Sequence, residues 1–83
     1  MNRIILVKIL HNHLLELTFE DSFCKVVDIT PFIGLGLSAA LHDEEYFQQV
    51  EIESGGGIYW PNGYDFCPNF LHDEAPSVSL ASV

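Results

Sequence analysis

The sequence predicts an α+β domain: an antiparallel β-meander of three strands, then a short β-hairpin, with two or three short helices. Three runs rich in Ile, Val, Leu and Phe occupy the first third of the chain and are separated by short polar breaks, which is typical of strands joined by turns. Glycine, proline and asparagine then concentrate in residues 55–71, GGGIYWPNGYDFCPNFL, where they enforce tight turns. The 83 residues are enough for one domain with a modest core.

The three apolar runs are expected to form strands at residues 3–10, 14–20 and 23–29. The second run alternates apolar and polar side chains, as in a strand that buries one face. The loop between the first two strands predicts three facing pairs: Val7 with Leu17, Ile5 with Phe19, and Lys8 with Glu16. A two-residue turn at Asp21-Ser22 predicts two more pairs: Leu17 with Val26, and Thr18 with Lys25.

These pairs predict a sheet with one apolar face, formed by Ile5, Val7, Ile9, Leu15, Leu17, Phe19, Cys24 and Val26. A shift of one residue would turn charged side chains into the core, so the hydrophobic pattern should fix the pairing. The opposite face mixes two kinds of residue: Lys8, Glu16, Thr18, Glu20 and Lys25 with Ile4, Leu6, Phe23 and Val27. Because monomers rarely expose large apolar patches, we expect another segment, a second copy or a partner to cover this face.

The middle of the chain predicts two short helical segments. A single helical turn is expected at residues 37–41. Asp43 is predicted to cap a second helix at residues 44–49, whose first turn carries two glutamates that interact favourably with the helix dipole. Phe47 and Val50 should then face the core.

The glycine-rich segment predicts a hairpin and a final helix. Residues 50–53 and 58–60 are expected to pair as antiparallel strands across a loop at residues 54–57. Pro61-Asn62-Gly63 should form a turn. A last helix of one or two turns should begin at Cys67-Pro68, because proline suits the first helical position.

Residues 1–74 are expected to form the domain, and residues 75–83 a flexible tail or a strand added to a sheet edge in an assembly. The apolar run at the N-terminus is interrupted by Lys8 and residues 11–13, and no small-residue cleavage site follows it. It therefore matches neither a signal peptide nor a membrane span. We expect a cytoplasmic protein with no membrane contact.

The formal net charge is −9, from twelve acidic side chains against the three bases Arg3, Lys8 and Lys25. These bases form no patch that could neutralise phosphates, so direct nucleic-acid binding is not expected. The acidic surface keeps a small apolar domain soluble, and it would suit a basic protein partner.

Cys24 and Cys67 allow one disulfide at most, and both are expected to be reduced thiols. Cys24 alternates onto the apolar face and should lie in the core, whereas Cys67 lies at a helix N-terminus. The triple glycine lacks the Lys-Ser/Thr that follows in a phosphate-binding loop. The four histidines lack the close spacing of a metal site: His11, His13, His42 and His72. The sequence therefore predicts no catalytic residue, no metal and no cofactor.

The order of motifs over roughly residues 4–74 resembles the DUF2442 family of small prokaryotic domains. The strand end is Val27-Asp28-Ile29, and the helix carries Leu41, Asp43, Phe47 and Val50. The hairpin carries Ile58, Trp60-Pro61-Asn62-Gly63 and Asp65, and the closing helix carries Pro68 and Leu71. The resemblance implies an α+β fold without an established activity. Family members occur alone or ahead of a helix-turn-helix domain, and stand-alone members resemble components of paired small bacterial systems. This implies a regulatory or interaction role.

Trp60, Asn62 and Asp65 are the candidate binding residues. In one interpretation they form a recognition edge, with an aromatic platform beside an amide and a carboxylate. In the other, Trp60 fills the core, Asn62-Gly63 makes the turn and Asp65 accepts backbone hydrogen bonds. A signature built from turn residues favours the second interpretation.

Three functions are compatible with these residues. The first is a protein-binding adaptor or regulatory module. The alternative is a small-ligand binder or enzyme with a pocket near Trp60 and Asp65, and a third is a homo-oligomer whose mixed sheet faces pair. The acidity, the small size and the lack of a catalytic constellation favour the first.

Overall fold

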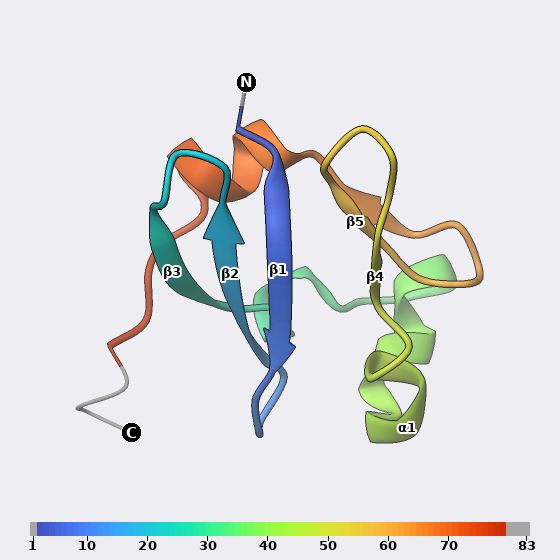
Figure 1. Cartoon of the computed structure of the whole chain (residues 1–83). Helices are drawn as coiled ribbons and strands as arrows, with labels where there is room; N and C mark the ends of the chain where they lie inside the picture. The colour runs from blue at the N-terminus through green and yellow to red at the C-terminus, as the bar shows by residue number, and fades with distance from the viewer. Residues whose placement is uncertain (1, 80–83) are drawn as a thin grey trace.

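Two small antiparallel sheets lie beside each other in the computed structural model, which describes residues 2–79 (Figure 1). The first sheet contains β1 (Ile4–Ile9), β2 (Leu14–Phe19) and β3 (Cys24–Asp28), in that order. The second contains β4 (Glu51–Ile52), β5 (Ile58–Tyr59) and β6 (Asp65–Phe66), also in that order. The helical segments are η1 (Thr30–Phe32), η2 (Gly36–His42), α1 (Glu44–Phe47) and the π-helical turn η3 (Phe70–Glu74). The predicted α+β class is confirmed.

The predicted pairing of β1 with β2 is correct except at its open end. Val7 faces Leu17 and Lys8 faces Glu16, but Ile4 takes the predicted place of Ile5 opposite Phe19. The cause is an irregularity between Ile4 and Leu6, where β1 carries one extra residue, as in a β-bulge. Ile4 is therefore buried, whereas Ile5 is exposed.

The predicted pairing of β2 with β3 is wrong by one residue. Leu17 faces Lys25 rather than Val26, because the connecting loop has three residues instead of two. The Phe19 N–H donates to the Phe23 carbonyl at 2.8 Å and closes this loop. The three-residue loop includes Ser22, whose backbone adopts the left-handed conformation with φ 74°.

Because strand side chains alternate, this shift moves every residue of β3 to the other face. Cys24, predicted to lie in the core, is exposed. Lys25 turns toward the core and is only 8% exposed. Its ammonium leaves the apolar region by donating to the Ala75 carbonyl at 2.6 Å and to the His72 carbonyl at 3.3 Å. The core-face prediction for Cys24 is therefore wrong, and Val26 also moves to the other face, although it is only 8% exposed.

The short helices form close to their predicted positions. The turn expected at residues 37–41 is the longer 3-10 helix η2. Asp43 caps α1, where its side chain accepts a hydrogen bond from the Glu45 N–H at 3.1 Å. Phe47 and Val50 are buried, as predicted.

The second sheet contains the predicted hairpin and one strand that was not predicted. β4 and β5 pair across the glycine loop, and β6 adds to the other edge of β5. The turn at Pro61-Asn62-Gly63 is confirmed, with the Trp60 N–H donating to the Tyr64 carbonyl at 2.9 Å. β6 was not predicted: its two residues, Asp65 and Phe66, lie between the turn and the final helix and show no longer apolar alternation.

The loop between β4 and β5 ties the two sheets together. The Ile4 N–H donates to the Gly56 carbonyl at 2.9 Å, and the Arg3 guanidinium donates to the Ser54 carbonyl at 2.8 Å. Gly56 has φ 95°, and a Cβ added there would lie 2.8 Å from the Cα of Arg3. Only glycine permits so close an approach of loop and strand.

The C-terminal helix begins at Pro68, as predicted, and buries Leu71. The following segment runs beside the edge of β3, where the Val78 N–H donates to the Val26 carbonyl at 2.8 Å. The last part of the predicted tail, residues 80–83, lies outside the described residues.

Both sheets contribute to one hydrophobic core. Its largest fully buried side chains are Trp60, Phe19 and Phe47. The core side of the first sheet faces the helices, and the other side faces the viewer in Figure 1. We call this second side the outer face.

Candidate functional site

Trp60, the first candidate binding residue, lies in the core with 0% of its surface exposed. Its Nε1–H donates to the Phe47 carbonyl at 2.9 Å, so the one polar atom of the ring is satisfied. The indole also packs near the rings of Phe47, Tyr64 and Phe66, with centroids 5.7, 6.1 and 6.1 Å away. The buried position that the sequence favoured for Trp60 is the one that the structure has.

Asn62 holds the turn and fastens it to neighbouring segments. Its Oδ1 accepts a hydrogen bond from the Tyr64 N–H at 3.1 Å, and its own N–H donates to the Tyr46 hydroxyl at 2.8 Å. Its Nδ2 donates to the carbonyl of Leu37 at 2.9 Å. The amide is thus engaged within the domain.

Asp65 is exposed on β6, opposite Tyr59. Because side chains alternate along β5, Tyr59 and Trp60 point to opposite faces of the second sheet. Asp65 therefore shares the face of Tyr59, not that of Trp60. Among residues 2–79, no hydrogen bond holds its carboxylate. The structure does not bring Trp60 and Asp65 together, and a binding role for the three candidates stays a prediction.

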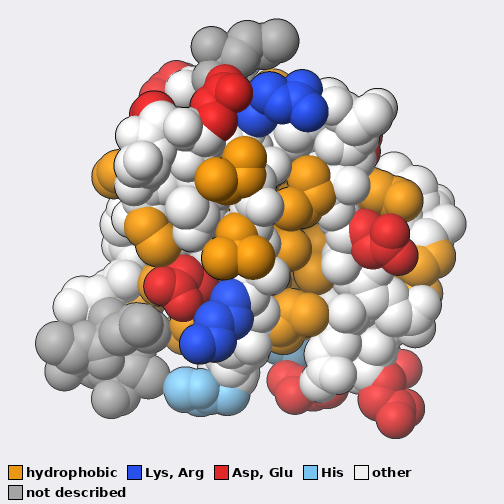
Figure 2. Space-filling view, in the orientation of Figure 1, with side chains coloured by type: hydrophobic (Ala, Val, Ile, Leu, Met, Phe, Trp, Pro, Cys, Tyr) orange, Lys and Arg blue, Asp and Glu red, His pale blue; other side chains and the backbone are white. Residues whose placement is uncertain are grey.

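The outer face of the first sheet contains none of the candidate residues but exposes apolar side chains. Ile5 and Leu6 are consecutive, and each is 59% exposed. Cys24 lies on the same face, and its thiol donates to a carboxylate oxygen of Glu16 at 3.6 Å. Figure 2 shows hydrophobic side chains in the middle of this face and charged side chains around them.

The three basic side chains neutralise little of the acidic surface. Lys25 is buried, and Arg3 is half-buried with its guanidinium bonded to the Ser54 carbonyl. Lys8 is exposed on the outer face, opposite Glu16. Few positive charges therefore offset the twelve acidic residues.

A comparison with protein families identifies the family of this chain. The model of a family described as a protein of unknown function, DUF2442, matches residues 4–77. The chain belongs to the DUF2442 family. Neither the comparison with curated proteins nor that with solved structures found a match.

His72 organises a polar cluster at one end of this DUF2442 domain. Its Nδ1 lies 2.7 Å from Asp73 Oδ1, and its Nε2 lies 3.0 Å from Asp21 Oδ2. Hydrogen bonds to Asp73 and Asp21 raise the pKa of His72. The Phe23 N–H and then His72 lower the pKa of Asp21. The cluster ties the loop between β2 and β3 to η3.

Within residues 2–79, no group of three or more His, Cys, Asp or Glu side chains could hold a metal ion. No helix in that range is long and apolar enough to cross a membrane.

Proposed function

We propose that this DUF2442 domain is a cytoplasmic protein-binding adaptor or regulatory module whose contact surface is the outer face of the first sheet. The observation that carries this proposal is the exposure of Ile5 and Leu6 together, each 59%. In a regular strand one of the two would point inward. The bulge in β1 turns both side chains outward, and exposed adjacent apolar side chains suit a partner's surface.

The partner that fits best is a basic protein with an apolar centre to its contact surface. The domain carries a net charge of −9, which attracts positive charge over distance. Two copies of the domain would repel each other for the same reason. Charge therefore favours a different protein over the homo-oligomer as the occupant of this face.

The alternative, a small-ligand site or enzyme pocket near Trp60 and Asp65, has weaker support. The indole is fully buried and its N–H already donates to Phe47. Asp65 lies on the opposite face of its sheet. A ligand could not contact both side chains without opening the core.

The proposal can be tested by capturing partners from a native lysate and then measuring the affinity of one purified partner. We expect Leu6→Ser to weaken a complex at this face by about tenfold or more, because central apolar contacts carry much of the binding energy. Leu35→Ser is the matched control, since Leu35 is 96% exposed in the loop before η2. Equal affinity of the wild type and Leu6→Ser for every purified partner would contradict the proposal.

Sedimentation of the isolated domain tests the competing occupant. We expect a monomer whose sedimentation does not change with protein concentration. A stable dimer that Leu6→Ser dissociates would show that a second copy, not a basic partner, covers the outer face.

A further inference from the structure

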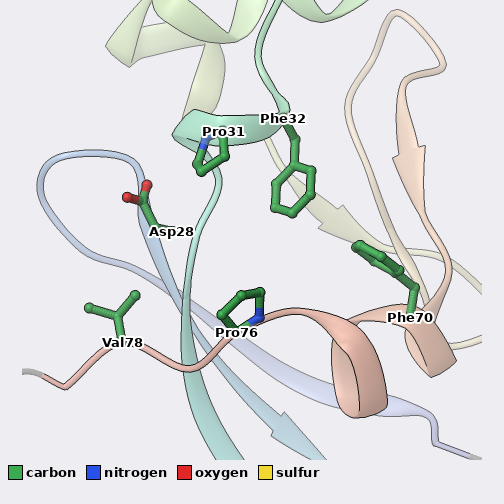
Figure 3. Close-up of a pocket in the computed structure, with 6 residues that line it drawn as sticks. All are labelled: Asp28, Pro31, Phe32, Phe70, Pro76 and Val78. Carbon is green, nitrogen blue, oxygen red and sulfur yellow. The ribbon is translucent and has the colours of Figure 1, made fainter.

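A cavity of about 350 Å³ lies between η1, the end of β3 and the C-terminal segment. None of the candidate binding residues lines it. Its walls come from six residues: Asp28, Pro31, Phe32, Phe70, Pro76 and Val78 (Figure 3). We propose that this cavity binds a small organic cation, namely an aromatic or branched aliphatic group that carries one ammonium.

The apolar part of the ligand is inferred from the walls. All lining residues except Asp28 present carbon atoms alone in their side chains. Phe32 and Phe70 face the same space from opposite segments, with ring centroids 5.7 Å apart and planes at 83°. Ligand cavities in proteins begin at about 300 Å³, so this one suits a single ring or a branched chain.

The positive charge is inferred from Asp28. One oxygen of its carboxylate accepts a hydrogen bond from the Thr30 N–H at 2.9 Å. No described residue forms an ion pair or hydrogen bond with the other oxygen. Asp28 lies at the end of the cavity away from Phe70 (Figure 3). An ammonium there would pair with the carboxylate while the ligand's apolar group lies against Phe32, Phe70 and Pro76.

Hydrogen bonds outside the cavity hold its walls in place. The Tyr64 hydroxyl donates to the Phe32 carbonyl at 2.9 Å and fixes η1. On the opposite side, the Ala75 N–H donates to the Phe70 carbonyl at 2.9 Å, and the Val78 N–H donates to Val26 at 2.8 Å. Because these contacts need no ligand, the cavity is formed before binding. Little conformational entropy of the protein is then lost when a ligand binds.

The test is a titration of the ¹⁵N-labelled full chain with 2-phenylethylammonium, followed by NMR. We expect saturable shifts at the backbone amides of the cavity residues that have one, with a dissociation constant in the millimolar range or below. 3-Phenylpropionate has the same ring and the opposite charge. We expect it to bind about three- to fivefold more weakly, since one partly exposed ion pair contributes up to about that factor.

A pair of variants separates the role of Asp28 from that of overall charge. Asp28→Asn keeps an oxygen for the Thr30 N–H and removes the charge, so affinity for the cation should fall about fivefold. Glu51→Gln removes one charge from an exposed position on β4 and should leave the affinity within about twofold. The comparison of the two ligands on the wild type tests the charge preference even if Asp28→Asn is poorly folded.

Three results would overturn the proposal. The first is the absence of a saturable shift when the cation is present at about 10 mM. That concentration is well above the dissociation constant expected for a ligand with one ring and one charge. The second is equal binding of the cation and the carboxylate. The third is a folded Asp28→Asn that binds the cation as tightly as the wild type does.

Discussion

The ammonium of Lys25 lies 2.6 Å from the carbonyl oxygen of Ala75, which is 50 residues further along the chain. Burial lowers the pKa of Lys25, because it disfavours the charged form. The hydrogen bonds to Ala75 and His72 offset this cost and join β3 to the end of η3. A lysine on the core face of a strand is thus compatible with the fold.

Lys25→Met should lower the free energy of unfolding by about 1–2 kcal/mol, because two backbone carbonyls lose their donor. Urea denaturation followed by the fluorescence of Trp60 measures this change. Lys8→Met is the control on the exposed outer face and should stay within about 0.5 kcal/mol of the wild type. A neutral or stabilising effect of Lys25→Met would mean that the hydrogen bonds contribute no net stability.

Trp60→Ala should lower the free energy of unfolding by about 3–5 kcal/mol, because it removes the largest buried side chain of the core. That loss approaches the whole stability of many small domains, so we expect the variant to be partly unfolded even without urea. Trp60→Phe keeps a ring but loses the hydrogen bond to Phe47, and an intermediate loss is expected. Circular dichroism during urea denaturation measures both. A folded Trp60→Ala that loses less than about 1 kcal/mol would contradict the core position.

The stability of the domain should depend on the protonation of His72. Its pKa is raised in the folded state, so the stabilisation is fully present below the unfolded value of 6.5 and is lost as pH rises through the folded pKa. Asp21 has a lowered pKa, so its contribution is present above 3.8 and is lost as pH falls through its folded pKa.

An NMR titration of the His72 ring measures its pKa directly. We expect Asp73→Asn and Asp21→Asn each to lower that pKa, because each removes a carboxylate hydrogen bond to the ring. His72→Gln should reduce the loss of melting temperature between about pH 6 and pH 8. An ordinary pKa for His72 in the wild type would show that the two carboxylates do not stabilise the protonated ring.

Two glycines with similar backbone angles separate strain from steric contact. Gly56 has φ 95° and lies against Arg3, whereas Gly63 has φ 94° and nothing within 4 Å of an added Cβ. Gly63→Ala should cost about 1–2 kcal/mol of unfolding free energy through backbone strain alone. Gly56→Ala should cost about 3 kcal/mol or more, because the loop must also move away from β1. Equal losses in the two variants, measured by urea denaturation, would argue against the close packing of this loop on β1.

The reactivity of Cys24 tests the register of β3. In the Cys67→Ser variant, Cys24 is the single thiol, and it should react with a thiol reagent in the native state because it is exposed. Had the two-residue turn formed, Cys24 would face the core and react only after unfolding. Cys24→Ser, which leaves the exposed Cys67, provides the reference rate.

Several features of the fold followed from local sequence patterns. The alternation in β2 predicted its buried face, and Asp43 predicted the start of α1. The Pro-Asn-Gly turn and the helix starting at Pro68 were also predicted. Each of these features depends on interactions between residues within a few positions of one another, so a local pattern is enough to predict it.

The registers at the ends of β1 and β3 could not be predicted in the same way. Alternation alone favoured a charged outer face with Lys25 on it, but Ser22 adopts a left-handed conformation and lengthens the loop. The shifted register is compatible with the fold because Lys25 finds carbonyl acceptors in the C-terminal segment. Those acceptors lie far away in sequence and adjacent only in space.

The sequence by itself determined the α+β class, the family, the buried tryptophan and the acidic surface. Tertiary structure decided which side chains remain exposed: Ile5 beside Leu6, Cys24 on the outer face and Asp28 at the rim of an apolar cavity. The physical reason is that local periodicity fixes which residues can share a face. Which face is exposed to solvent then depends on the bulge in β1, the length of the turn between β2 and β3, and contacts between distant segments.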